Sequence, residues 1–148
     1  KPILDQLCRR VDHVGPAGAG ASMKLAINLP LAVFWQAMGE AYALCRHLGG
    51  DTSWLVELFA DTSGGPNVLK ARGAAVAAAL SAKEPGSATF DCDGIRKDLR
   101  TMLAEARARG FDLPLAERTL AVYDQASRDG WGGRDCTELP AYWSGQKG

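Results

Sequence analysis

One stretch constrains the fold of this chain more than any other. Three glycines within the six residues 15–20 are followed by a long apolar pattern. The glycines permit tight turns and close backbone approach. From Met23 to Cys45 the apolar residues recur every three or four positions, which is the period of a helix. Gly49-Gly50 is a stop signal, so the pattern predicts one helix from about Ala21 to Leu48, unusually long for a small domain.

Two polar residues stand out near the start of this predicted helix. Lys24 and Asn28 are four residues apart and therefore share one helix face. The first turn of a helix carries partial positive charge, which disfavours a lysine there and favours the loss of its proton. On the residues alone, the favoured interpretation is a solvated lysine beside a Gly-rich loop. Pro30 lies inside the predicted helix, and a kink is expected near it.

Composition narrows the range of functions. A chain of 148 residues predicts one domain. Its net charge of zero argues against nucleic acid and anionic membranes as partners. Four cysteines without C-x-x-C spacing and two histidines leave little for a metal site. We expect Cys45 to be a buried thiol, the cysteines to be reduced and the protein to be cytoplasmic. No signal peptide or membrane-spanning segment is apparent.

The rest of the chain is predicted to form further helices. Asp51 is an expected N-cap. The apolar face of the helix that it starts is expected to comprise Trp54, Leu55, Leu58 and Phe59, with Trp54 in the core. Another helix should begin at Pro66 or Asn67. Asp91 or Asp93 should cap the next, and Leu113-Pro114 should open a fifth that ends near Gly130. One more helical turn is expected between Cys136 and Tyr142. The predicted fold is an all-α bundle of about five or six helices around the long one.

Two motifs carry a resemblance to a known family. Gly18-x-Gly20-x-x-x-Lys24-x-x-x-Asn28 is similar to the catalytic-helix motif of the β-hydroxyacid dehydrogenases, which include 3-hydroxyisobutyrate dehydrogenase and tartronate semialdehyde reductase. Phe90, followed at seven residues by Lys97-Asp98-Leu99, resembles a second segment of that family. A weaker match comprises Gly110, Leu113-Pro114-Leu115, Tyr123, Gly130 and Asp135.

The resemblance implies a domain organisation. The fold would be that of the C-terminal domain of 6-phosphogluconate dehydrogenase, a larger relative. Residues 1–14 would be the end of an N-terminal Rossmann domain or its linker, and residues 15–148 a helical catalytic and dimerisation domain. NAD or NADP would be bound mainly by the absent N-terminal domain, so this chain alone would be inactive. Homodimers or higher oligomers are implied, without a nucleic-acid or membrane partner.

The resemblance also implies roles for individual residues. Lys24 would be the general acid or base on the substrate oxygen. Asn28, Gly18 and Gly20 would bind the substrate, and Lys97 would reach the cofactor or the substrate carboxylate. Each also has a plainer interpretation: Asn28 as an amide satisfied within the bundle, Lys97 as a solvated side chain, and the glycines as an interdomain turn.

Asp98 and Phe90 have secondary parts in this hypothesis. We expect Asp98 to pair or cap locally rather than react, and Phe90 to pack at the wall of the cleft. No metal ligand is predicted.

Two functions follow from these residues. The first is an NAD(P)-dependent oxidoreductase domain that acts on a small β-hydroxyacid or its semialdehyde and supplies Lys24. The alternative is a non-catalytic helical oligomerisation module. Lys24 argues against the related imine reductases, which usually lack a lysine there. The identity of the hydroxyacid and the choice between NAD and NADP stay open.

Overall fold

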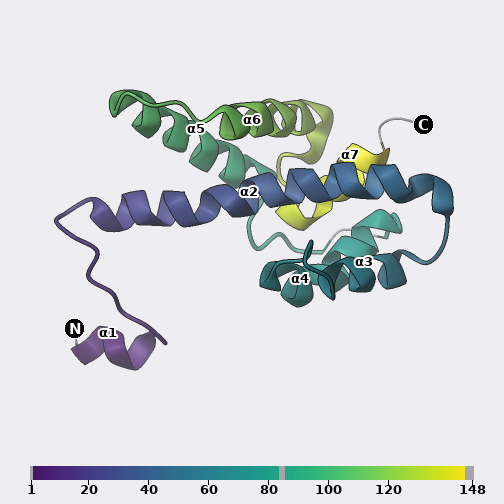
Figure 1. The fold of residues 1–148 in the computed structure, drawn as a ribbon, viewed down its shortest axis with the longest axis horizontal. Coiled ribbons are helices and arrows are strands. Elements are labelled where there is room, and N and C mark those ends of the chain that lie inside the picture. The colour runs from purple at the N-terminus through teal and green to yellow at the C-terminus, as the bar shows by residue number, and fades with distance from the viewer. Residues whose placement is uncertain (1, 84–85, 146–148) are drawn as a thin grey trace.

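A computed structural model describes residues 2–83 and 86–145, and these form seven α-helices (Figure 1). No strand occurs within these ranges, which confirms the all-α class; α1 and α7 bring the number of helices above the five or six expected. The helices are α1 (Pro2–Leu7), α2 (Ala19–Cys45), α3 (Thr52–Ala60), α4 (Asn67–Leu80), α5 (Cys92–Ala108), α6 (Pro114–Ala126) and α7 (Leu139–Gly145).

The long helix α2 spans 27 residues and crosses the whole molecule (Figure 1). It begins two residues before the predicted start and ends at Cys45, where a short 3₁₀ turn, Arg46–Leu48, follows. Gly18 precedes it with φ of 94°, a conformation that favours glycine. The helix continues through Pro30, whose side chain is exposed. The predicted helix is therefore confirmed, with shifted ends.

The two halves of α2 differ in burial. Trp35, Met38 and Tyr42 in the second half are buried. Met23 and Ile27 in the first half were predicted on the same apolar face, but they are 45% and 66% exposed. The described residues therefore cover only part of the apolar face of α2.

The other long helices form two pairs. In Figure 1, α5 and α6 lie on one side of α2, and α3 and α4 lie on the other, beside its C-terminal half. Helix α7 packs against that same half of α2 and closes the core. Helix α1 stands apart from this body, joined to α2 by residues 8–18, which form no helix or strand.

Several predicted helix boundaries are confirmed. The side chain of Asp51 accepts a hydrogen bond from the Trp54 amide, and that of Asp91 accepts one from the Gly94 amide, so both residues are N-caps. Pro114 opens α6, which ends at Ala126 and continues into a π-helical turn, Ser127–Trp131. The tail predicted to hold one helical turn forms the 3₁₀ helix Cys136–Glu138 and α7.

The predicted burial of three side chains was wrong. Trp54 is 57% exposed and Leu58 46% exposed, because α3 turns Val56 towards α4 and the core instead. Cys45 is half-buried rather than buried, since it lies at the last residue of α2.

A buried carboxylate joins the start of α5 to the C-terminal segment. The side chain of Asp135 accepts hydrogen bonds from the backbone amide and hydroxyl of Thr89, at 2.8 and 3.0 Å, and from those of Thr137, at 3.0 and 2.7 Å. Arg72 on α4 donates to the same carboxylate at 2.9 Å. We call this group, Asp135 with Thr89, Thr137 and Arg72, the Asp135 junction. It fixes the segment immediately before α5.

The backbone reinforces the Asp135 junction. The Cys92 amide donates to the Arg134 carbonyl and the Cys136 amide to the Phe90 carbonyl, each at 2.9 Å. The thiols of Cys92 and Cys136 are buried there, and burial raises the pKa of each to about 12. Burial by itself would raise the pKa of Asp135, but the hydrogen bonds from Thr137 and Thr89 outweigh it and hold that pKa far below the ordinary value.

Replacing this carboxylate tests the Asp135 junction. Asp135→Asn should lower the free energy of unfolding at pH 7 by about 3 kcal/mol, because Arg72 loses its partner and the amide cannot accept all the hydrogen bonds. Asp61→Asn, at an exposed ion pair with Lys70, should change it by less than about 1 kcal/mol. Urea unfolding of both variants measures the difference.

The difference between wild type and Asp135→Asn should depend on pH. A carboxyl group with a lowered native pKa stabilises the fold fully above its unfolded pKa of about 4, and this contribution is lost as the pH falls further towards the native pKa. Unfolding of both proteins from pH 7 to pH 2 should therefore show a shrinking difference below about pH 4. An equal difference over this whole range would contradict the assignment.

Candidate active site

Lys24 lies on the surface of the first half of α2. Because α2 begins at Ala19, this residue is in the second turn rather than the first turn expected from the sequence. Its side chain is exposed, and no ion pair among the described residues involves it. The ammonium group is thus accessible to a substrate approaching this face of α2.

Asn28, one turn further along α2, is tied to a different helix. Its side-chain amide nitrogen donates a hydrogen bond of 3.3 Å to the carboxylate of Asp98 on α5. Both side chains are half-buried. Asp98 does pair, as expected, but its partner lies 70 residues away in the sequence. The structure thus joins the two motifs that carry the family resemblance.

Lys97 directly precedes Asp98 on α5, and its side chain is exposed. It therefore lies beside the Asn28–Asp98 contact, although consecutive residues of a helix point in different directions. The structure brings together Asn28, Asp98 and the backbone of Lys97, with Lys24 one turn away on α2.

A second contact fixes α2 against α5 near its N-terminus. The Ser22 hydroxyl donates to the Glu105 carboxylate at 3.4 Å, and Arg109 forms an ion pair with that carboxylate at 2.6 Å. Ser22 precedes Asn28 and Glu105 follows Asp98, so α2 and α5 run antiparallel. Lys24 falls between the two contacts, which hold the backbone of α2 at this position.

The two predicted substrate-binding glycines lie apart from this pairing. Gly18 adopts a positive φ directly before α2, and Gly20 lies in the first turn. A Cβ added to either would meet nothing within 4 Å. The conformation of Gly18 requires glycine, whereas nothing in the described residues approaches either position closely.

Two residues that position α5 lie outside the predicted catalytic, substrate-binding and cofactor-binding residues, and Phe90 was expected only to pack at the wall of the cleft. Phe90 is half-buried and lies over the first turn of α5, where a Cβ on Gly94 would come within 2.7 Å of its ring. Asp135 holds the neighbouring Thr89. The position of Asp135 in the weaker family motif was the one signal in the sequence, because spacing alone does not pair residues this far apart.

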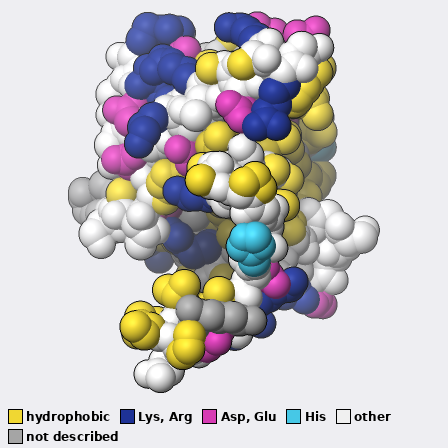
Figure 2. All heavy atoms as spheres, turned by 90° about the vertical axis from the view of Figure 1, so that its left-hand side faces the viewer, with side chains coloured by type: hydrophobic (Ala, Val, Ile, Leu, Met, Phe, Trp, Pro, Cys, Tyr) yellow, Lys and Arg dark blue, Asp and Glu magenta, His cyan; other side chains and the backbone are white. Residues whose placement is uncertain are grey.

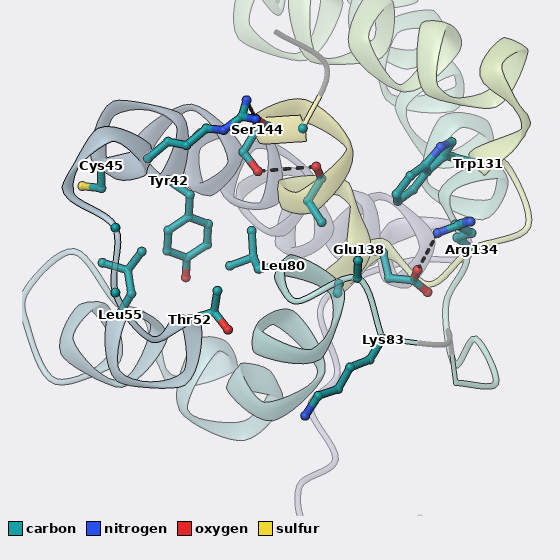
Figure 3. A pocket seen from close by; sticks show the side chains of 17 residues that line it. Tyr42, Cys45, Thr52, Leu55, Leu80, Lys83, Trp131, Arg134, Glu138 and Ser144 are labelled. Atoms are coloured by element: carbon teal, nitrogen blue, oxygen red, sulfur yellow. Dashed lines mark hydrogen bonds and ion pairs between the residues drawn. The ribbon is translucent and has the colours of Figure 1, made fainter. Parts of the chain in front are cut away.

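A cavity of about 320 Å³ lies between the first half of α2 and α5, and Ser22, Leu25 and Glu105 are among the residues that line it. Figure 2 views the end at which α2 begins, and there hydrophobic side chains adjoin a region of mixed positive and negative charge. A cavity of about 570 Å³ lies at the other end of α2, among α3, α4 and α7 (Figure 3). Arg134 lines this cavity of about 570 Å³. Its guanidinium group pairs with Glu138 at 3.3 Å and stacks 3.8 Å above the Trp131 ring. Lys24, Asn28 and Lys97 line neither this cavity nor the one of about 320 Å³ between α2 and α5.

The described ranges support neither a metal site nor a membrane-spanning helix. Residues 2–83 and 86–145 contain no group of three or more His, Cys, Asp or Glu side chains arranged to hold a metal ion. Within the same ranges, no helix combines the length and the apolar character needed to cross a membrane.

Comparisons with known proteins identify the family. The sequence profile of the family described as NAD-binding of NADP-dependent 3-hydroxyisobutyrate dehydrogenase matches residues 18–143. An NAD-dependent L-serine dehydrogenase of Pseudomonas aeruginosa is 28% identical over 137 residues, which cover 91% of this chain and 46% of that protein. A probable 3-hydroxyisobutyrate dehydrogenase of Mycobacterium tuberculosis is 26% identical over 134 residues, with coverages of 87% and 45%.

Solved structures show the same fold. A crystal structure of 3-hydroxyisobutyrate dehydrogenase from Salmonella typhimurium matches with a TM-score of 0.82 and 25% identity, over 95% of this chain and 48% of that one. The chain thus spans about half the length of the relatives that it matches. The match of residues 18–143 to the family profile shows that this chain belongs to the 3-hydroxyisobutyrate dehydrogenase family of NAD(P)-dependent hydroxyacid dehydrogenases.

Proposed function

We propose that this chain is the C-terminal helical domain of an NAD(P)-dependent oxidoreductase that acts on a small β-hydroxyacid or its semialdehyde. The observation that carries the proposal is the site itself: an exposed Lys24 one helical turn from an Asn28 that Asp98 holds in place. The relatives are named for L-serine and 3-hydroxyisobutyrate, which are both small 3-hydroxyacids. A substrate of this class carries the hydroxyl group on which a lysine acts.

Lys24 has the chemistry that this reaction needs. The nicotinamide cofactor supplies or accepts the hydride. In the oxidative direction, the neutral amine of Lys24 takes the proton from the substrate hydroxyl; in the reductive direction, its ammonium group donates that proton to the developing alkoxide. Asn28 orients the substrate or Lys24 by a hydrogen bond to its side-chain amide.

The described residues fit only part of a dinucleotide. The exposed ammonium group of Lys97, beside the Asn28–Asp98 contact, suits a carboxylate or the polar end of the cofactor. Gly18-Ala-Gly20-Ala-Ser-Met23 lacks the third glycine of a dinucleotide-binding loop and follows no strand within residues 2–17. In this proposal the phosphates of NAD or NADP are held by an N-terminal domain, and residues 1–14 are its end or the linker from it.

Substitution of Lys24 tests the catalytic role, in a protein that joins this chain to its dinucleotide-binding domain. Lys24→Ala should lower kcat/KM by about 10²–10⁴-fold, the usual contribution of a positioned proton-transfer group. Lys24→Arg should also be poor, because a guanidinium keeps its proton near neutral pH. Initial rates with L-serine and 3-hydroxyisobutyrate, with both cofactors, measure the effect.

Lys70→Ala, at an exposed lysine on α4, is the matched control and should leave kcat/KM unchanged. All variants should melt at the wild-type temperature, since Lys24 is exposed. Near-normal turnover by Lys24→Ala with a normal melt would show that this lysine is not the proton-transfer group.

The alternative function, an oligomerisation module, is favoured by one observation. Met23 and Ile27 expose apolar surface on the first half of α2. An apolar stripe of this kind suits a second copy of the chain or another domain. Association and catalysis are compatible, so we propose that this stripe of α2 contributes to a homodimer or larger oligomer, while loss of turnover in Lys24→Ala separates the two functions.

A charged substitution tests the proposed association. Ile27→Glu should weaken self-association at least about tenfold, because a carboxylate would be buried in an apolar contact. Leu115→Glu, at a side chain of α6 that is 69% exposed, should have little effect. Sedimentation velocity over a range of concentrations gives both values. A wild-type chain that stays monomeric at high concentration would contradict the proposed association.

A further inference from the structure

The Asn28–Asp98 contact imposes a direction on the amide. A carboxylate accepts hydrogen bonds and cannot donate them, so the amino group of Asn28 must face Asp98. The carbonyl oxygen of the same amide is then turned away from Asp98. None of the hydrogen bonds found among the described residues ends on this oxygen, which leaves it available to a donor.

The carboxylate of Asp98 does little for the packing of α2 on α5. Apolar side chains supply that packing, with Leu99 and Met102 of α5 buried and Leu25 and Leu29 of α2 packed against the core. Asp98 is half-buried and belongs to no ion pair among the described residues. Partial burial of an unpaired carboxylate opposes folding. A role in orienting Asn28 accounts for a charge at this position better than stability does.

The location of the Asn28–Asp98 contact also supports a role of Asp98 in orienting Asn28. Asn28 is one turn from Lys24 on α2, and Asp98 follows Lys97 on α5. The donors expected near the carbonyl oxygen of Asn28 are a substrate hydroxyl and the ammonium group of Lys24. If the Asn28 amide were rotated by 180°, its amino group would face the substrate hydroxyl and Lys24. An amino group cannot accept a hydrogen bond from either of them.

We propose that Asp98 is a positioning residue, which fixes the side-chain amide of Asn28 so that its carbonyl oxygen faces the reacting hydroxyl or Lys24. The inference rests on the proposed function of this site. It assigns Asp98 no contact with substrate and no proton transfer, because Asp98 acts through Asn28 alone.

A double-mutant cycle tests this dependence in the protein that joins this chain to its dinucleotide-binding domain. Asn28→Ala and Asp98→Ala should each lower kcat/KM for L-serine or 3-hydroxyisobutyrate by about 10- to 100-fold, the scale of a lost orientation. In the double variant the effects should not add, since Asp98 has nothing left to orient. Glu105→Gln, at the second contact between α2 and α5, should add independently to Asn28→Ala. Asp98→Asn, of equal volume, replaces Asp98→Ala if the latter does not fold.

Exchange of the two residues separates positioning from stability. The pair Asn28→Asp with Asp98→Asn keeps one hydrogen bond between the helices but places the carboxylate on α2. A purely structural contact would recover both the melting temperature and kcat/KM; the proposal expects recovery of the melting temperature alone.

The outcomes distinguish the positioning role of Asp98 from the proposed function of the site. Additive effects of Asn28→Ala and Asp98→Ala, or recovered turnover in the exchanged pair, would overturn the positioning role and leave the function of Lys24 intact. Normal turnover in both Lys24→Ala and Asn28→Ala would instead overturn the proposed function itself.

Discussion

The hydrogen bonds of the buried Asp135 carboxylate determine where α5 begins. Thr89 is held by this carboxylate, and two residues later Asp91 caps the first turn of α5. The direction of α5 then sets the position of Asp98, seven residues into the helix, and through it that of Asn28 on α2. The Asp135 carboxylate thus supports a contact between two helices that no turn or loop of the chain connects directly.

The candidate site occupies the less covered half of the longest helix. The second half of α2 packs on α7 and lies beside α3 and α4, and α6 lies against α2 from Ala32 onward. The first half of α2 contacts α5. Hydrogen bonds from Ser22 and Asn28 to α5 hold this half on one side only. An open face suits a site that another domain completes, because a cofactor and a substrate need room between the two.

The sequence predicted the elements of this fold better than their contacts. Helical spacing and stop signals identified α2. Asp51 was predicted as a cap, and Asp91 as one of two candidates with Asp93, because capping depends on residues three positions away. Lys24 and Asn28 were placed on one face by their spacing. The contact of Asn28 with Asp98 could not be predicted, because it depends on how α2 and α5 pack. Periodicity grouped Met23 and Ile27 with Met38 and Tyr42, but it does not say which part of an apolar face is covered.

The two buried thiols at the Asp135 junction make its opening observable. Cys92 and Cys136 lie beside the bridge between residues 91 and 135, shielded from solvent, with thiol pKa values raised to about 12. A protonated, buried thiol does not react with an alkylating reagent until the structure around it opens. Cys8 is exposed, so it is modified without any such opening. Labelling of Cys92 and Cys136 would therefore report the separation of the C-terminal segment from α5, at the start of the helix that carries Asp98.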